Sequence, residues 1–210
     1  GVAKVDYSSN QFAFLKGNLT DAALPSEPIR FIAEDNNGGF YVGVKGNNNL
    51  YYSEKNSTVE ILKTPIINGK KRRNGKLAIR ALYQDNTANI WLADNAYLYH
   101  FDKKTKSLKQ VNVRNQKNNK IWGLNKLTAL FQASDGVFWI GTQQYGVKKS
   151  IASGNPFNQT FKTILRNDRI SVFVEDKKKN LWIGTYNGLV KYITNLDSYT
   201  RYTKDPGAIA

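Results

Sequence analysis

Leu181-Trp182-Ile183-Gly184 decides the fold of this chain, because three earlier stretches repeat its pattern of an apolar residue, an aromatic, a branched apolar residue and a small residue. The earlier copies are Phe40-Tyr41-Val42-Gly43, Ile90-Trp91-Leu92-Ala93 and Phe138-Trp139-Ile140-Gly141. Their central aromatics lie 50, 48 and 43 residues apart. Self-similarity at a period of about 40–50 residues indicates a repeat architecture.

A second apolar run precedes each copy and ends six residues before the aromatic. The four runs are Ile29–Asp35, Ile79–Asp85, Leu127–Ala133 and Ile170–Asp176. Turn formers separate each run from its motif, and a third and a fourth strand follow, as in Asn187–Tyr192 and Ser198–Tyr202. Four short strands per repeat are typical of a β-propeller blade. We therefore predict an all-β chain that forms a β-propeller of about four four-stranded blades.

The strand pattern also divides the chain. We predict a leading half blade with strands three and four and a connection at residues 1–28, blades at 29–78, 79–126 and 127–169, and a last blade with a tail at 170–210. Four blades and a half leave an open sheet edge at each end, which proteins rarely tolerate. We therefore expect the chain to be a segment of a longer propeller, with the remaining blades as its partners.

The aromatic of each motif has an expected structural role. A blade sheet packs against a neighbour on both faces, so its strands are apolar on both sides. We expect the aromatics, Trp182 included, to fill the space between blades. Replacing a fully buried Trp by Ala costs about 3–5 kcal/mol, and we predict that loss for Trp182→Ala.

Charge is the strongest property of the composition. The 210 residues carry 31 Lys and Arg against 16 Asp and Glu, a formal net charge of +15. This excess favours polyanionic partners, such as nucleic acid, an anionic surface or an acidic glycan, and does not distinguish between them. The absence of Cys excludes disulfides and thiol catalysis. No apolar run is long enough for a transmembrane helix.

Propeller geometry places the loops between strands two and three on the same face as the connections between blades. These segments are rich in amide, aromatic and guanidinium groups, which suit a sugar: aromatic faces stack on pyranose rings, and the polar groups bind hydroxyl and acidic substituents. The alternative interpretation is that they are solvated turns. The candidate ligand-binding residues are Arg72, Arg73, Lys120, Trp122, Gln143, Tyr145, Arg169, Tyr186 and Asn187.

Other polar residues are assigned to structure. Glu34-Asp35 and Glu175-Asp176 recur at the end of the first strand, so they belong to the turn scaffold. His100, the only His, has no predictable acid or nucleophile partner. We predict no catalytic residue, no metal site and no cofactor, and we expect this segment not to be an enzyme.

The last repeat resembles the two-component regulator propeller repeat along Ile170–Asp176, Leu181–Thr185 and Asn187–Tyr192. A second good copy, Leu127–Val147, includes Trp139-Ile140-Gly141-Thr142. The other repeats depart from the pattern: Tyr41 and Val44 stand where Trp and Thr are usual, and Ala93-Asp94 replaces Gly-Thr. Ala133 also replaces the turn Asp in the Leu127–Val147 copy.

The resemblance implies the sensor region of a bacterial hybrid two-component regulator. Such regions typically form two consecutive propellers, followed by an immunoglobulin-like domain, a membrane helix and a histidine kinase. The implied function is periplasmic detection of an oligosaccharide by a homodimer, with a signal to a kinase outside this chain. The charge makes an acidic or sulfated oligosaccharide our hypothesis, and nucleic acid is not expected.

Two other functions stay open on the sequence alone. One is a propeller lyase or hydrolase that acts on an acidic polysaccharide, which would require a catalytic cluster at the rim. The other is a basic interaction propeller, whose binding would fall steeply with salt and would lack glycan selectivity.

Overall fold

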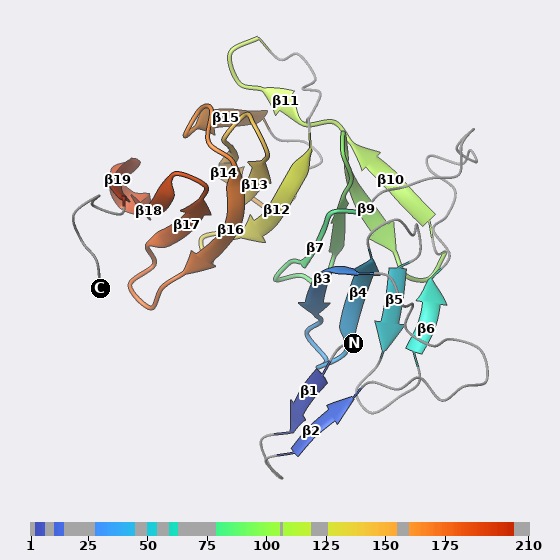
Figure 1. Cartoon of the computed structure of the whole chain (residues 1–210). Helices are drawn as coiled ribbons and strands as arrows, with labels where there is room; N and C mark the ends of the chain where they lie inside the picture. Colours follow the sequence, from blue (N-terminus) through green and yellow to red (C-terminus); the bar gives the residue numbers. More distant parts are fainter. Residues whose placement is uncertain are drawn as a thin grey trace.

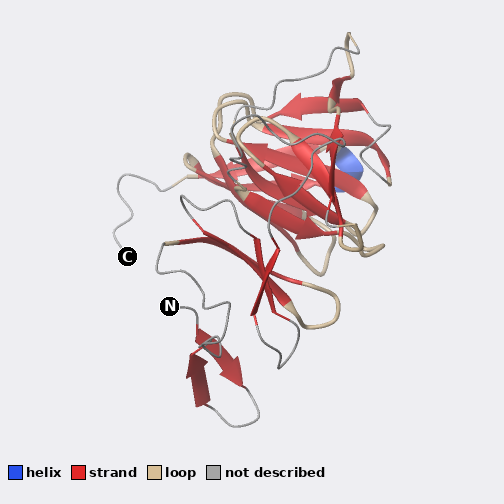
Figure 2. Cartoon of the chain, turned by 90° about the vertical axis from the view of Figure 1, so that its right-hand side faces the viewer, coloured by secondary structure: helices blue, strands red, loops and turns tan. Residues whose placement is uncertain are grey.

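The computed structural model describes residues 3–6, 11–14, 28–44, 50–53, 59–62, 79–105, 107–118, 126–154 and 160–203, with the backbone alone for 3–6, 11–14 and 59–62. Strands dominate these ranges (Figure 2). Their only helical element is the 3-10 turn η2 (Thr194–Leu196). None of their helices is long and apolar enough to cross a membrane. The all-β prediction is confirmed.

Four sheets follow one another along the chain, each with its blade strands in sequential antiparallel order. First strands of successive sheets contact each other, and the sheets lie in an arc (Figure 1). This arrangement is the predicted β-propeller of four blades. Its strands are β3 (Ile29–Glu34), β4 (Phe40–Val44), β5 (Leu50–Ser53), β6 (Val59–Leu62), β7 (Ala81–Gln84), β8 (Ile90–Ala93), β9 (Leu98–Asp102), β10 (Ser107–Val111), β12 (Leu127–Gln132), β13 (Val137–Thr142), β14 (Val147–Ser153), β15 (Thr160–Ile164), β16 (Ile170–Glu175), β17 (Leu181–Thr185), β18 (Gly188–Ile193) and β19 (Ser198–Tyr202).

Two further strands precede the first blade. β1 (Ala3–Asp6) and β2 (Gln11–Phe14) pair as an antiparallel hairpin, with Ala3 opposite Phe14. They lie beyond the β3–β6 sheet, at the blue end of the arc (Figure 1). Their positions match the two strands predicted for the leading half blade.

A recurring carboxylate organises the turn between the first two strands of a blade. Asp85 Oδ1 accepts hydrogen bonds from the backbone N–H groups of Thr87 and Asn89, both at 2.9 Å. Its Oδ2 accepts a bond of 2.8 Å from the indole of Trp91. Asp176 repeats this pattern, with Trp182 Nε1 at 2.9 Å. The role in the turn scaffold predicted for Asp35 and Asp176 is confirmed.

The aromatics of the middle blades fill the space between sheets. Trp91 and Trp139 are both fully buried. The ring of Trp91 meets Phe138 of the next blade edge-on at 5.7 Å, and Trp139 meets Tyr192 in the same way at 5.0 Å. The inter-blade role predicted for the motif aromatics is confirmed for these two.

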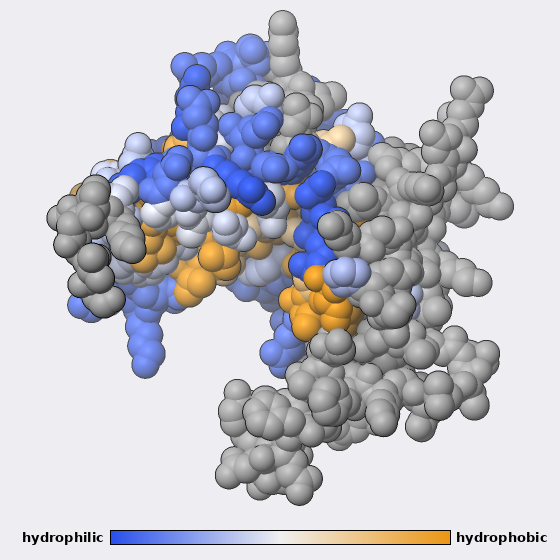
Figure 3. Space-filling model, in the orientation of Figure 1, coloured by the Kyte–Doolittle hydropathy of each residue, from blue (hydrophilic) through white to orange (hydrophobic). Residues whose placement is uncertain are grey.

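Trp182 departs from this pattern within the described residues, where no neighbouring blade covers its ring, so the inter-blade placement predicted for it stays a prediction. Its ring is only partly buried and stacks at 5.9 Å on Tyr202 of its own sheet. Val172 and Val174, on the same face, are 50% and 55% exposed, whereas Ala129, which matches Val172 in the preceding blade, is 8% exposed. The physical reason is that no sheet among the described residues packs on this face of β16–β19. Figure 3 shows hydrophobic surface along this part of the arc.

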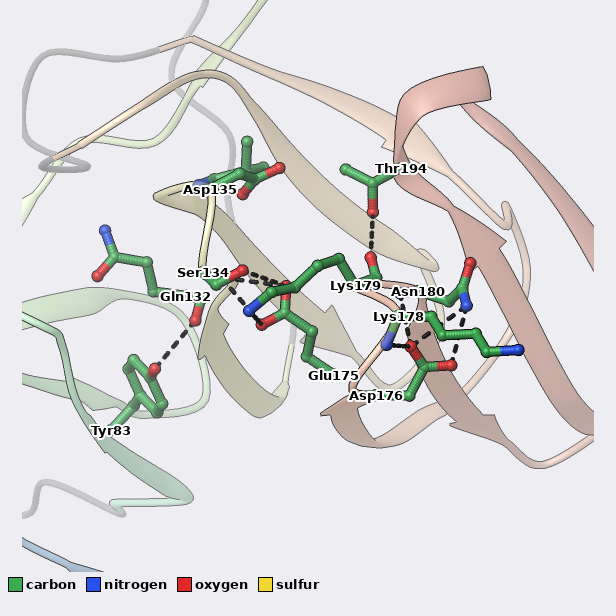
Figure 4. Close-up of polar contacts among 11 residues, drawn as sticks. Tyr83, Gln132, Ser134, Asp135, Glu175, Asp176, Lys178, Lys179, Asn180 and Thr194 are labelled. Atoms are coloured by element: carbon green, nitrogen blue, oxygen red, sulfur yellow. Dashed lines mark hydrogen bonds and ion pairs between the residues drawn. The ribbon is translucent and has the colours of Figure 1, made fainter.

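Adjacent blades are also joined through their turns. The Ser134 N–H donates a hydrogen bond of 3.1 Å to Glu175 at the end of the next first strand (Figure 4). The Asn86 N–H reaches Gln132 at 3.3 Å in the same way. The Asn36 N–H reaches Gln84 at 2.7 Å. This repeated bond, here called the turn contact, sets the register between successive blades.

Candidate ligand-binding rim

Two kinds of loop meet on one face of the propeller. We define the rim as the β13–β14 turn (residues 143–146), the β17–β18 turn (186–187) and the β15–β16 connection (165–169). The Gly146 N–H donates to the Asp168 carbonyl at 3.2 Å, and the Tyr186 N–H donates to the Arg169 carbonyl at 3.0 Å. Strand two-to-three loops and an inter-blade connection are therefore neighbours, as the propeller geometry requires.

Five of the candidate residues lie on this rim. Tyr145 and Tyr186 are 46% and 79% exposed, Arg169 and Asn187 are exposed, and Gln143 is partly buried. Their part in ligand binding stays a prediction. The other four candidates, Arg72, Arg73, Lys120 and Trp122, lie outside the described residues.

Asn187 has a structural contact as well as an exposed position. Its Nδ2 donates a hydrogen bond of 3.1 Å to Asp168 Oδ1. Asp168 is 4% exposed, and its other oxygen forms an ion pair with Arg201. This network joins the β15–β16 connection to the β17–β18 turn, so it orients the part of the rim that carries Tyr186.

A pocket of about 310 Å³ opens beside Tyr145. One wall comes from β11 (Arg114–Asn115), which pairs in parallel with the outer strand β15. The Gln116 N–H continues this pairing to the Phe161 carbonyl at 3.0 Å. Tyr145 is the one candidate among its lining residues, which are Asn115, Gln116, Lys117, Tyr145, Lys148, Lys162, Thr163, Arg166 and Asn167.

Lys148 is the most buried cation of this pocket, at 7% exposure. Its Nζ donates to the Tyr145 carbonyl at 3.2 Å and to Thr163 Oγ1 at 2.9 Å. Burial, assisted by the positive charge of Arg166, lowers the pKa of Lys148 to about 8. Lys162 also lines the pocket, but its ammonium group forms an ion pair with Asp197.

The opposite face carries a wider and more open hollow of about 900 Å³, between the turns of the last two blades. Its carboxylate Glu175 binds Ser134 in the turn contact (Figure 4). Lys178, Lys179 and Lys191 also line it. This surface has mixed charge, because Asp135 and Glu175 line it together with the lysines, and the Glu175 carboxylate already binds the turn of the adjacent blade.

Sequence reasoning missed the residues that form the pocket over Tyr145. Lys117, Lys148 and Arg166 come from three separate segments, and β11 was not predicted at all. The signal that could have identified Lys148 is its place in the repeat. Strand pairing places Lys148 opposite Ile140. At the same position of the other three blades, the pairs are Tyr51 with Val42, Tyr99 with Leu92 and Val190 with Ile183.

Comparison with known proteins agrees with this architecture. Residues 164–187 match the family model described as two component regulator propeller. The resemblance seen in the sequence is confirmed for this repeat. The matched stretch contains the β15–β16 connection and the β17–β18 turn, which are two of the three parts of the rim. No curated protein matches the sequence.

Several solved structures share the fold. The extracellular domain of a hybrid two component system of B. thetaiotaomicron aligns with 100% of this chain and 26% of its own length, with a TM-score of 0.70 and 16% identity. A second such domain from B. thetaiotaomicron has a TM-score of 0.58 and 20% identity over 89% of this chain and 23% of its own. Virginiamycin B lyase from Staphylococcus aureus has a TM-score of 0.63 and 10% identity over 87% and 58%. The chain thus spans about a quarter of the length of the two component system domains. At these identities the likeness establishes the fold alone.

Proposed function

We propose that this chain is a ligand-sensing part of the extracytoplasmic region of a two-component regulator and that its rim binds an oligosaccharide. The observation that carries the proposal is the family match at residues 164–187, because that stretch supplies Arg169, Tyr186 and Asn187 to the rim. The extracellular domains of two hybrid two component systems, which share the fold, support the same role.

The chemistry of the rim supports a sugar ligand. Tyr186 exposes most of its ring, which can stack on the apolar face of a pyranose. Asn187 and Arg169 lie beside it and carry donors for sugar hydroxyl groups. The network at Asp168 holds this arrangement, so little order has to be created when the ligand binds.

In this proposal the chain binds and does not catalyse. The ligand favours one arrangement of the propellers in a homodimer, and a histidine kinase outside this chain responds to the change in population. The membrane anchor would likewise lie outside this chain, and the rim would face the periplasm.

We further propose that the exposed face of β16–β19 receives another blade of the same protein. Val172 and Val174 present apolar surface there, and Trp182 is only partly buried. The preceding blades cover the matching positions and add the turn contact, as between Ser134 and Glu175. The incoming blade would therefore bring a Gln or Glu at the end of its first strand, to accept the Lys177 N–H.

Isothermal titration calorimetry of the full chain with a panel of neutral and acidic oligosaccharides tests the sensing proposal. Replacing a stacked aromatic removes about 1–2 kcal/mol of binding, so Tyr186→Ala should weaken affinity about tenfold. The control is Tyr199→Ala, since Tyr199 is also an exposed Tyr (50%) and lies at the other end of the same sheet. Equal affinities for the two variants would contradict a site at Tyr186.

Analysis of the same oligosaccharides after incubation with the protein separates a sensor from an enzyme. A propeller lyase shares this fold, so the oligosaccharides are analysed by mass spectrometry after prolonged incubation. Unchanged chain lengths are expected for a binding protein. Shortened or unsaturated products would favour the lyase or hydrolase alternative and overturn the proposal.

A further inference from the structure

The pocket beside Tyr145 holds a charge at a position where the fold favours an apolar or aromatic side chain. In three blades the residue in register with Lys148 is Tyr51, Tyr99 or Val190, and these are 3%, 1% and 0% exposed. Lys148 itself is 7% exposed. Placing an ammonium group at such a site disfavours folding. The fold that the four blades share does not require a Lys at this position, so the buried Lys148 points to a function that is specific to the third blade.

The surroundings of Lys148 are positive. Two acceptors of its hydrogen bonds, the Tyr145 carbonyl and the Thr163 hydroxyl, are neutral. Arg166 and Lys117 come from the two segments that flank the pocket, and neither Asp nor Glu is among the described residues that line it. The lowered pKa of Lys148, caused by its burial and by Arg166, is consistent with this excess of positive charge.

The pocket is also a built structure. β11 is held against β15 by the pairs Arg114 with Thr160 and Asn115 with Phe161. Asn115 Oδ1 accepts the Lys117 N–H at 2.8 Å, which fixes the backbone of the turn that carries this cation. Asn115, Gln116 and Asn167 also line the pocket, and their amide groups offer donors suited to oxygen atoms.

We propose that this pocket binds one carboxylate or sulfate group carried by a sugar of the sensed oligosaccharide, with Lys148 and Arg166 as the anion-binding residues. This deepens the proposed function and rests on it, because the anion is assigned to the oligosaccharide. Tyr145 links the pocket to the rest of the rim: its carbonyl binds Lys148, and its exposed ring lies beside the cavity. The charged group would thus enter the pocket while the neighbouring sugar rings lie along the rim.

Matched ligands separate charge from sugar recognition. A tetrasaccharide of galacturonic acid is compared by calorimetry with the same tetrasaccharide after methyl esterification, and a sulfated galactan tetrasaccharide with its desulfated form. Inorganic sulfate is titrated alone. We expect at least one acidic tetrasaccharide to bind more tightly than its neutral counterpart, and sulfate alone to bind much more weakly.

Three variants of the full chain assign the effect to the pocket. Hydrogen bonds to a charged group contribute about 1.5–3 kcal/mol, so Lys148→Met should lower the affinity for the acidic tetrasaccharide about tenfold or more. Arg166→Gln changes an exposed side chain, so it tests the same pocket without disturbing the core. The control is Lys178→Gln, an exposed Lys on the opposite face, which should leave the affinity unchanged.

The outcomes distinguish the two proposals. Neutral and acidic tetrasaccharides that bind equally well, or acidic binding that survives both Lys148→Met and Arg166→Gln, would overturn the anion pocket and leave oligosaccharide sensing intact. Sulfate binding without binding of any tetrasaccharide would overturn both. The two proposals are supported together if the protein prefers an acidic tetrasaccharide, if Lys148→Met and Arg166→Gln each abolish that preference, and if Lys178→Gln preserves it.

Discussion

Trp139 lies six residues after Ala133, and this pair matches Trp91 with Asp85 and Trp182 with Asp176 in the neighbouring blades. In those blades the indole N–H donates a hydrogen bond to the carboxylate, but Ala133 has no side-chain acceptor. Within the described residues, the buried Nε1 of Trp139 consequently has no hydrogen-bond partner. A buried donor without a partner costs about 1–3 kcal/mol. The third blade is therefore weakened by the residue that departs from the repeat.

Ala133→Asp should repair this turn. The Ala133 N–H already bonds to the Val137 carbonyl at 2.9 Å, as the Asp85 N–H does to Asn89, so the backbone is in place for the carboxylate. We expect the free energy of unfolding to rise by about 1–2 kcal/mol at pH 7, measured by urea denaturation. Hydrogen bonds lower the pKa of the new carboxyl group when folded, so the gain should be lost as the pH falls below about 4.

The control for this variant is Ala152→Asp, which adds the same charge at an exposed position of β14. Surface substitutions usually change stability by less than about 0.5 kcal/mol. A similar gain for both variants would indicate a general charge effect, and the interpretation of the turn would then fail.

Tyr41 presents the same problem in the first blade. It stands where Trp is usual, and Asp35 instead accepts a hydrogen bond of 2.6 Å from Tyr52. The Tyr41 hydroxyl is buried without a hydrogen-bond partner among the described residues, and burial raises its pKa. Tyr41→Phe should therefore stabilise the fold by about 1 kcal/mol. Tyr52→Phe is the matched control and should destabilise it, so a loss of stability in Tyr41→Phe would contradict the assignment.

The two Trp residues of the best-matching repeats should differ in their importance for stability. Trp139 is fully buried between blades, and Trp139→Ala should cost about 3–5 kcal/mol. Trp182 is only partly buried, so Trp182→Ala should cost about 2 kcal/mol or less. Thermal and urea unfolding of both variants measures the difference, and equal losses would contradict the open face of β16–β19.

Repeat spacing predicted the blades well because each strand recurs at a matching position, as at Leu181–Thr185 and Val137–Thr142. A local pattern cannot reveal pairing between distant segments. β11 has two residues, and three strands (β12, β13 and β14) separate it in sequence from its partner β15. Nothing in its own sequence therefore marks it as a strand. Nothing in the local sequence distinguishes Lys148 from an ordinary exposed strand residue, because its burial depends on the segments that cover it. The rim loops were located by topology, but the pocket required the fold.

Asp197 joins the last two blades through charge. Its carboxylate bonds to Lys149 Nζ at 2.8 Å and also pairs with Lys162. Lys149 lies over the rings of Trp139 and Tyr192, at 5.3 and 4.9 Å from their centroids. Lys149 is largely buried and the Asp197 side chain is 52% exposed, so removing the Asp197 charge leaves a mostly buried ammonium group without its carboxylate, at a cost reduced by solvent screening. Asp197→Asn keeps the left-handed backbone (φ 49°), which Asn tolerates, and should cost about 1–2 kcal/mol.

A double-mutant cycle with Lys149→Met tests this coupling. Replacing both partners removes the uncompensated ammonium group, so the double variant should be more stable than the sum of the two single losses predicts. Urea denaturation of the four proteins gives the interaction free energy. Strict additivity would indicate that Asp197 and Lys149 act independently.

Lys148→Met should make the protein more stable while it weakens anion binding. The ordinary pKa of a Lys is 10.5, and burial first, then Arg166, lowers the pKa of Lys148 to about 8 in the folded chain. The unfolded chain therefore binds more protons between pH 8 and 10.5, and the stability of the unmodified protein rises through that window. Below pH 8 Lys148 is charged in the folded and in the unfolded chain, so the unfavourable free energy of burying this charge is fully present in the unmodified protein. Replacing such a charge by an apolar side chain of similar size often stabilises by about 1–4 kcal/mol.

The expected signature of Lys148→Met is thus a stability gain at pH 7 that shrinks as the pH rises from 8 to 10.5. Urea denaturation at several pH values measures it, with Lys178→Met as the control at an exposed Lys, which should show no pH-dependent difference. A gain that stays constant across this range would mean that the charge of Lys148 is not the destabilising feature. A gain that follows the titration of Lys148 would show that this blade accepts a less stable core in order to hold a cation beside the rim.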